Sequence, residues 1–258
     1  MMGRWFMLLW IWWGMLQAQP PQEVVLSAST GLRLGIAVPA VRVQGLDEER
    51  VARDLHGTLL RDLEEAGPFS LVREGHPRSV EPTSFKQWAE IGTDWLLTLK
   101  ATRLQGEELE VLAQVTDVKS GKADFTRRYH GQDRMLRRVA HTLADDPVAR
   151  LTGERGVAST RIVFVRDLGQ GVKELFQVDR DGQGLVQLTS HRSLTLSPTV
   201  APDGRLAYIT FKSGAPEIWG QSKPGGPHVR LYPQDGAKGI GHLSAPAWSP
   251  DGRRLAFV

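Results

Sequence analysis

The sequence predicts two domains, an α/β domain followed by the first blades of a β-propeller, and three observations lead to this. The stretch 197–210, SPTVAPDGRLAYIT, recurs 48 residues later as 245–258, APAWSPDGRRLAFV. Around these copies, short apolar runs fall four to a period between turn residues, which is typical of propeller blades. Ahead of them, strand patterns alternate with helical patterns, which indicates an α/β or α+β domain with a mixed sheet. An unrelated β-meander is the alternative for the repeats.

The N-terminus has the pattern of a secretory signal peptide. One positive charge, Arg4, precedes an almost wholly apolar run over residues 5–16, which is short for a membrane span but suits a signal core. Cleavage after Ala18 is expected, so that residues 1–18 are removed and Gln19 begins the mature chain. An uncleaved membrane anchor is the alternative. The chain has no Cys, which excludes acylation on Cys, disulfides and thiolate metal sites.

Composition favours a folded chain with a solvated surface. The sequence is 41% hydrophobic and 24% charged, as expected for one or two globular domains. Residues 155–258 carry 13 Lys and Arg against 8 Asp and Glu, while residues 1–154 carry 19 against 21. The cations of the repeats are scattered singly, whereas nucleic-acid binders cluster them, so no nucleic-acid partner is expected.

The domain 19–152 begins with three strands and a helix. Residues 24–26 could form an edge strand or pair with a partner, because the prolines before them forbid regular structure. A buried strand over 32–38 follows. Asp47 is placed to cap a helix whose apolar residues recur at helical spacing, and Gly67 with Pro68 ends it before a strand over 69–72. The apolar residues of this helix are Val51, Leu55, Leu59, Leu60 and Leu63.

The second half of this domain reads as a helix, three strands and a helix. Thr83 is expected to cap a helix over 83–91, and Phe85, Trp88, Ala89 and Ile91 form its apolar side. Strands over 95–99, 109–118 and 123–130 are joined by hairpin turns. A final helix starts near Asp133. The helices are expected to cover one face of the mixed sheet.

The repeats occupy 157–258, after a turn-rich boundary at 152–156. Each copy of Pro-Asp-Gly, at 202–204 and 250–252, supplies a turn, because Pro presets φ, Asp caps its own backbone and Gly accepts positive φ. Two blades and the first strand of a third are expected.

No catalytic or metal-binding motif is present in the sequence, and neither cofactor nor metal is expected. Residues 179–182 start like an EF-hand loop, but Gln183 stands where the third oxygen ligand is needed, so an ordinary hairpin turn is favoured. His141, alone on a helix, is interpreted as packed or solvated rather than as a ligand.

The chain resembles the TolB family, the periplasmic β-propeller proteins of the Tol-Pal system of the Gram-negative envelope. Three passages carry the resemblance: the junction from His141 through residues 151–153 to 160–165, the motif at 197–214, and the motif at 242–252. The resemblance implies a six-bladed propeller, which needs more residues than follow position 157. The chain is therefore expected to be incomplete at its C-terminus, and completion of two blades by self-association is the alternative.

The resemblance also implies a function without catalysis. The expected role is to bind a peptidoglycan-associated lipoprotein, Pal, and a TolA-like inner-membrane protein, and so to support outer-membrane integrity, division and protein import. Implied lipoprotein-binding residues are His242 and Ala245, with Ser197 and Pro198 one blade earlier. The N-terminal binding segment is Glu23, Val24, Val25 and Leu26, which could instead be a strand docked on its own domain. No membrane insertion is expected after signal cleavage. An exported propeller-linked hydrolase, with its catalytic part elsewhere, is the alternative.

Overall fold

The computed structural model describes residues 33–77, 79–234 and 241–258. The signal peptide and the segment Glu23 to Leu26 lie outside the described residues. The described residues belong to one compact unit, Arg33–Val258. Among their helices, none is both long enough and apolar enough to cross a membrane.

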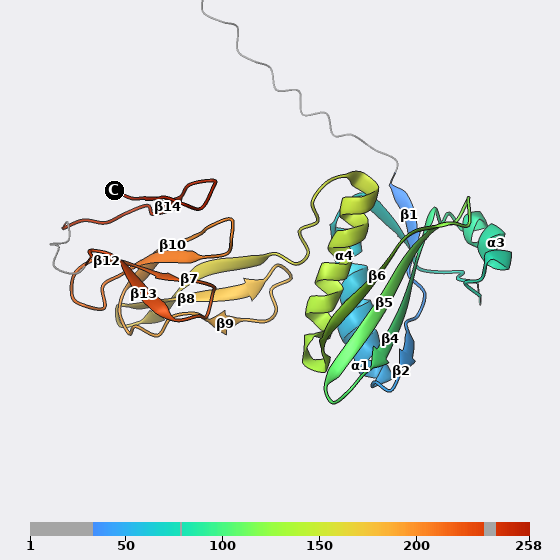
Figure 1. Cartoon of the computed structure of the whole chain (residues 1–258), viewed down its shortest axis with the longest axis horizontal. Coiled ribbons are helices and arrows are strands. Elements are labelled where there is room, and N and C mark those ends of the chain that lie inside the picture. The colour runs from blue at the N-terminus through green and yellow to red at the C-terminus, as the bar shows by residue number, and fades with distance from the viewer. Residues whose placement is uncertain (1–32, 78, 235–240) are drawn as a thin grey trace, which may run out of the picture. The chain divides into compact units, whose positions relative to one another are not determined.

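A six-stranded mixed sheet forms the α/β domain, as the sequence predicts (Figure 1). Its strand order is β3-β1-β4-β5-β6, and β2 pairs with β4 beside β1. Strand β1 is parallel to β3 and β4, whereas β4, β5 and β6 form antiparallel hairpins. The strands are β1 (Leu34–Ala37), β2 (Arg42–Gln44), β3 (Phe69–Val72), β4 (Trp95–Arg103), β5 (Glu108–Asp117) and β6 (Ala123–Gln132). The sequence analysis missed β2, because three residues are too few for an alternating pattern.

The first helix is continuous but changes its winding. Helix α1 (Glu48–Arg50) passes into a π-helical segment, Val51–Gly57, and then into α2 (Thr58–Glu65). The Asp47 side chain accepts a hydrogen bond from the backbone N–H of Arg50, which confirms the predicted cap. Leu55, Leu59 and Leu63 are fully buried on one side of this helix.

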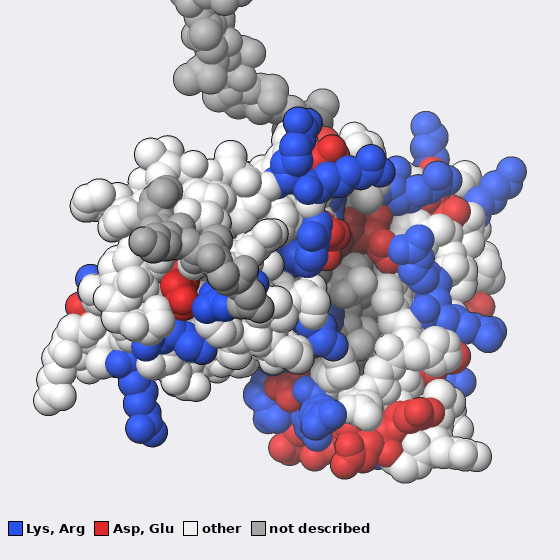
Figure 2. Space-filling view, turned by 60° about the vertical axis from the view of Figure 1, so that its left-hand side comes forward, with Lys and Arg blue, Asp and Glu red and all other residues white. Residues whose placement is uncertain are grey.

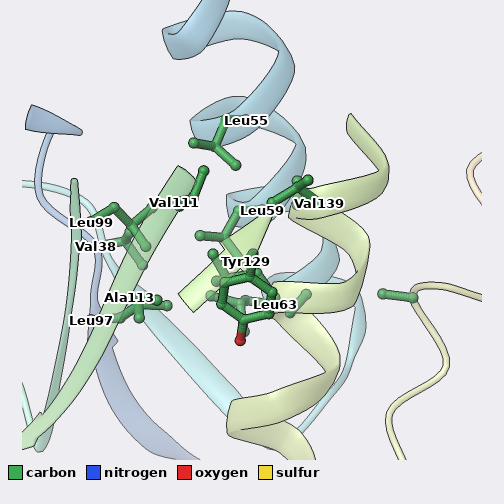
Figure 3. Close-up of a cluster of buried hydrophobic side chains, with 14 of the residues drawn as sticks. Val38, Leu55, Leu59, Leu63, Leu97, Leu99, Val111, Ala113, Tyr129 and Val139 are labelled. Carbon is green, nitrogen blue, oxygen red and sulfur yellow. The ribbon is translucent and has the colours of Figure 1, made fainter. Parts of the chain in front are cut away.

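Helix α4 (Leu136–Thr152), preceded by a 3-10 turn at Asp133–Met135, lies beside α2 on the same face of the sheet. Figure 3 shows the core between them, where side chains of both helices meet those of the strands. Strand residues alternate, so Leu97, Leu99, Val111 and Ala113 all point to this face. These contacts bury the largest continuous apolar cluster of the described residues.

Helix α3 (Phe85–Glu90) corrects two expectations. Thr83 does not cap it but lies inside a preceding 3-10 turn, Pro82–Ser84. The helix also packs on the opposite face of the sheet, where Trp88 contacts a second cluster that includes Leu96 and Val118 (Figure 1). The expectation that all helices cover one face is therefore wrong for α3. Because adjacent residues of a strand point to opposite faces, Leu96 needs a cover that α2 and α4 cannot supply.

Three antiparallel sheets follow. The first holds β7 (Arg161–Gly169), β8 (Val172–Asp179) and β9 (Val186–Gln187). The second holds β10 (Thr195–Val200), β11 (Leu206–Thr210), β12 (Glu217–Gln221) and β13 (His228–Tyr232). The third pairs β14 (Ala247–Trp248) with β15 (Leu255–Ala256). The described part of the third repeat thus has two strands rather than the one expected, because the residues on either side of its turn pair with each other.

The sheets pack face to face through the alternating side chains of β11. Leu206 and Tyr208 join a cluster with Leu175 and Leu188 of the first repeat. Ala207 and Ile209 point the other way, into a cluster that Leu243 and Leu255 of the third repeat complete. A strand buried on both faces within a stack of antiparallel sheets is the arrangement expected of a propeller blade.

Substitution of Gly35 in β1 tests how closely this strand packs against the backbone of Gly92. A Cβ atom placed on Gly35 would lie 1.9 Å from the carbonyl oxygen of Gly92. We therefore expect Gly35→Ala to lower the free energy of unfolding by about 2 to 3 kcal/mol, since an overfilled core must shift backbone. Gly57→Ala is the control, because its Cβ would meet nothing closer than 3.4 Å and helical Gly→Ala stabilises by about 1 kcal/mol. Urea unfolding measures the free energy of unfolding of both variants. If Gly35→Ala and Gly57→Ala change it equally, the close approach of β1 to Gly92 does not limit the packing.

Candidate protein-binding rim of the repeats

The residues expected to bind the lipoprotein lie at the starts of two successive repeats. We call Ser197, Pro198, His242 and Ala245 the rim. Ser197 and Pro198 lie within β10, and Ala245 lies in the segment that leads into β14. Ser197, His242 and Ala245 are all exposed. Strands β10 and β14 contact each other, so the structure brings the two repeat positions to neighbouring strands.

The backbone is left-handed at the same position of both repeats. Ser197 has a φ of 50° and Ala245 a φ of 48°, and a proline follows each of them. At Ser197 the pairing of β10 with β11 shifts register between Leu196 and Thr199. The sequence offered no sign of this, because neither Ser nor Ala favours positive φ as Gly does.

This backbone geometry needs support, since a non-glycine residue with positive φ costs about 1 to 2 kcal/mol. For Ala245, the two residues before it provide this support. Leu243 is buried against the second sheet. Ser244 exchanges two backbone hydrogen bonds with Val258, at N–O distances of 2.7 and 3.1 Å. The segment is therefore fixed while its exposed side chains face outward.

In the third repeat, the rim presents one polar side chain and one small side chain to solvent. His242 has no hydrogen-bond partner among the described residues, so its imidazole is available to donate or accept a bond from a partner. Ala245 is small, which allows another chain to approach the backbone closely. Within residues 33–77, 79–234 and 241–258, no group of three His, Cys, Asp or Glu side chains could hold a metal ion.

Strands β10 and β14 each end at a Pro-Asp-Gly turn, away from the rim. The side chains of Asp203 and Asp251 accept backbone N–H bonds from Arg205 and Arg253, and the glycines have positive φ, which confirms the predicted turns. The guanidinium of Arg205 lies 4.7 Å from the centroid of the Trp248 ring and donates to the carbonyl of Gly252. Arg205 of the second repeat therefore contacts the third repeat at this end.

Two polar clusters were missed by the sequence analysis. In the first, the Tyr208 hydroxyl lies 3.0 Å from Nε2 of His191 and 2.7 Å from Nδ1 of His228. Burial lowers the pKa of both imidazoles, with a smaller contribution from the charge of Lys212. These histidines are therefore neutral at pH 7, and with Tyr208 they join the segment after β9 to strands β11 and β13.

The second cluster joins two features that the sequence analysis had set aside. The turn at 179–182 is an ordinary hairpin, in which Gly182 donates to the carbonyl of Asp179. Its Asp181 side chain is nevertheless only 3% exposed and contacts Arg137 and His141 of α4. His141 also bonds Asp62 of α2. The available signal was that Asp62 and His141 fall on the apolar sides of their helices, where a polar side chain needs a partner.

The strain at the rim can be measured. We expect Ala245→Gly to raise the free energy of unfolding by about 1 kcal/mol, because Gly adopts positive φ without steric cost, and Ser197→Gly to act in the same direction. Ala247→Gly is the matched control two residues on, in β14, where Gly should destabilise by about 0.5 to 1 kcal/mol. Urea unfolding of the three variants decides the point. Destabilisation by all three would show that the left-handed backbone is absent.

Two family models match consecutive parts of the chain. Residues 23–123 match the TolB amino-terminal domain, and residues 148–258 match the TolB beta propeller domain. The Tol-Pal system protein TolB of Geobacter sulfurreducens is 32% identical over 189 residues, which cover 71% of this chain and 43% of that protein. The TolB homolog of Chlorobaculum tepidum is 31% identical over 225 residues, covering 84% and 49%.

The fold agrees with these matches. The crystal structure of TolB from Acinetobacter baumannii superposes with a TM-score of 0.68 at 23% identity, covering 87% of this chain and 54% of that one. The chain spans about half the length of the curated relatives it matches. Because the two family models follow each other in the same order as the two parts of the fold, the chain belongs to the TolB family of β-propeller proteins.

Proposed function

We propose that this chain is a non-enzymatic, periplasmic component of a Tol-Pal system that works by binding other proteins. Support comes from relatives named Tol-Pal system protein TolB and from the exposed rim of the repeats. On this proposal residues 1–18 direct export and are removed, and the protein supports outer-membrane integrity and constriction at division. No direct contact with nucleic acid or insertion into the membrane is part of the role.

The observation that carries the proposal is the repeated left-handed backbone at Ser197 and Ala245. Strained backbone persists where a function or a packing constraint requires it, and here it turns exposed residues outward at two equivalent places. Figure 2 shows areas of uncharged residues between groups of intermingled Lys, Arg, Asp and Glu. Exposed residues on a fixed backbone, beside uncharged surface, suit docking of a folded protein.

We assign this surface to a peptidoglycan-associated lipoprotein of the Pal type. His242 would exchange a hydrogen bond with it, and the small side chain of Ala245 would let the lipoprotein approach the backbone. Ser197 and Pro198 would extend the contact across the preceding repeat. The segment Glu23 to Leu26 would pair as a strand with a TolA-like inner-membrane protein, with Val25 and Leu26 as apolar anchors.

Substitutions at the rim test the first assignment. We expect His242→Ala and Ala245→Arg each to weaken lipoprotein binding at least about tenfold, which corresponds to about 1.4 kcal/mol. The first removes a hydrogen-bonding group, and the second places a bulky cation in the contact. Isothermal titration calorimetry against the purified lipoprotein gives the affinities, and circular dichroism and melting should stay unchanged.

Ala215→Arg is the matched control, because Ala215 is an exposed alanine in the loop between β11 and β12. It should leave the affinity intact. If Ala245→Arg also binds normally, the lipoprotein surface lies elsewhere.

Deletion of residues 19–26 tests the second assignment. We expect the deletion to abolish binding to the inner-membrane partner without lowering the melting temperature, since a segment that waits for a partner adds nothing to its own domain. A pull-down with the partner and a thermal melt measure the two effects. Retained binding would argue against the assignment, and a fall in melting temperature would identify the segment as a docked strand.

A further inference from the structure

Four charged side chains meet where α2 and α4 touch the turn between β8 and β9. The side chains of Asp62, His141 and Asp181 are only 2%, 3% and 3% exposed, and that of Arg137 is 23% exposed. Asp62 and His141 belong to the α/β domain, whereas Asp181 belongs to the first repeat sheet. Charges are costly to bury, so this arrangement demands compensation.

Only one of the two ring nitrogens of His141 is hydrogen-bonded within this cluster. Nδ1 of His141 donates to Oδ2 of Asp62 over 2.6 Å. Arg137 donates to Oδ2 of Asp181, which also accepts at Oδ1 from the backbone N–H of Gln183. Nε2 of His141 lies 3.7 Å from Oδ2 of Asp181 and has no hydrogen-bond partner in the described part of the chain. The imidazole therefore stands between two carboxylates and bonds only one.

Charge balance requires His141 to carry a proton on each nitrogen. Asp181 pairs with Arg137 and, at 3.7 Å, with Arg61, whereas Asp62 has no cation other than His141 among the described residues. A neutral imidazole would therefore leave the buried charge of Asp62 uncompensated. Burial by itself lowers the pKa of His141, but the hydrogen bond and charge of Asp62, with the charge of Asp181, outweigh it and hold the pKa above its ordinary value. Burial likewise raises the pKa of Asp181, but the bonds from Arg137 and Gln183 prevail and keep it below its ordinary value.

We propose that doubly protonated His141 latches the first propeller blade to the α/β domain through Asp181, and that loss of its proton opens this latch. In the protonated state an N–H faces the carboxylate of Asp181. Because Nδ1 is held as a donor by Asp62, the proton that leaves is the one on Nε2. A lone pair then faces the Asp181 carboxylate at the same 3.7 Å, so attraction becomes repulsion and the turn of the first blade is pushed from its place.

The direction of the pH dependence follows from the raised pKa. The contribution of His141 to the latch is complete below the pKa of an unfolded histidine, about 6.5, and is lost as the pH rises through the higher pKa of the folded protein. The charged groups that act on His141 are Asp62 from α2, Arg137 from α4 and Asp181 from the turn, and Arg61 of α2 lies 3.7 Å from Asp181. Among these residue types only histidine normally changes charge between about pH 6 and pH 9.

Spin labels can report the latch directly, because the sequence has no Cys of its own. Lys119→Cys and Lys223→Cys place labels at exposed positions of the α/β domain and the second sheet. Double electron–electron resonance on the labelled chain should give one narrow distance distribution at about pH 6 and a broadened one at about pH 9. The midpoint should coincide with the pKa of His141 measured by NMR on the same protein.

Variants separate the latch from a general effect of pH. His141→Gln keeps an amide donor for Asp62 without the charge, so its distribution should be broad at both pH values. Asp181→Asn should broaden it at about pH 6 as well. Asp124→Asn, which breaks the exposed pair between Asp124 and Arg150, is the matched control and should behave as the parent does.

Two results would overturn the proposal. One is a distribution in the parent that stays narrow at both pH values while the NMR signals show that His141 has lost its proton. The other is a narrow distribution in Asp181→Asn, whose folding is checked by the dispersion of its NMR spectrum. The second variant keeps the test valid if His141→Gln fails to fold.

Discussion

The buried hydrogen bond between Asp62 and His141 is the interaction on which the proposed latch between the two parts of this chain depends. It joins α2 and α4, the two helices that cover the largest apolar core. Removal of one partner from such a pair leaves an uncompensated polar group inside the protein, which typically costs about 3 to 5 kcal/mol. The bond also fixes the imidazole so that its other nitrogen faces Asp181.

A second contact on α4 acts on the segment that follows the helix. The carboxylate of Asp145 accepts the backbone N–H groups of Ala158 and Ser159 and also the hydroxyl of Ser159. Gly156 passes so close that a Cβ atom there would lie 2.5 Å from the Cα of Asp145. One helix thus packs against the sheet, bonds its neighbouring helix and guides the chain into β7.

The repeats follow a different physical rule, because each sheet is built from residues near in sequence. Every blade strand pairs with its sequence neighbour, and the Pro-Asp-Gly turns set the hairpins. Successive repeats are joined by the face-to-face packing of β11, by the contact of Arg205 with Trp248 and by the bond from Gln221 to the carbonyl of Leu188. Because these contacts do not involve the side chains of Ser197, His242 and Ala245, those side chains stay exposed on a fixed backbone. The proposed binding surface lies there.

What the sequence determined by itself was the local structure. The Asp47 cap, the hairpin turns, the strand over 69–72 and the two-part order of the chain all follow from interactions within a few residues, and the structure confirms each of them. The repeat also identified the equivalent positions of Ser197 and Ala245. Tertiary structure alone decided which face α3 covers, that β2 pairs with β4, and that both rim residues have positive φ. It alone brought Asp181 to His141, 40 residues earlier in the chain. The physical reason is that long-range packing chooses among local conformations of similar energy, and a single sequence holds no record of which distant residues meet.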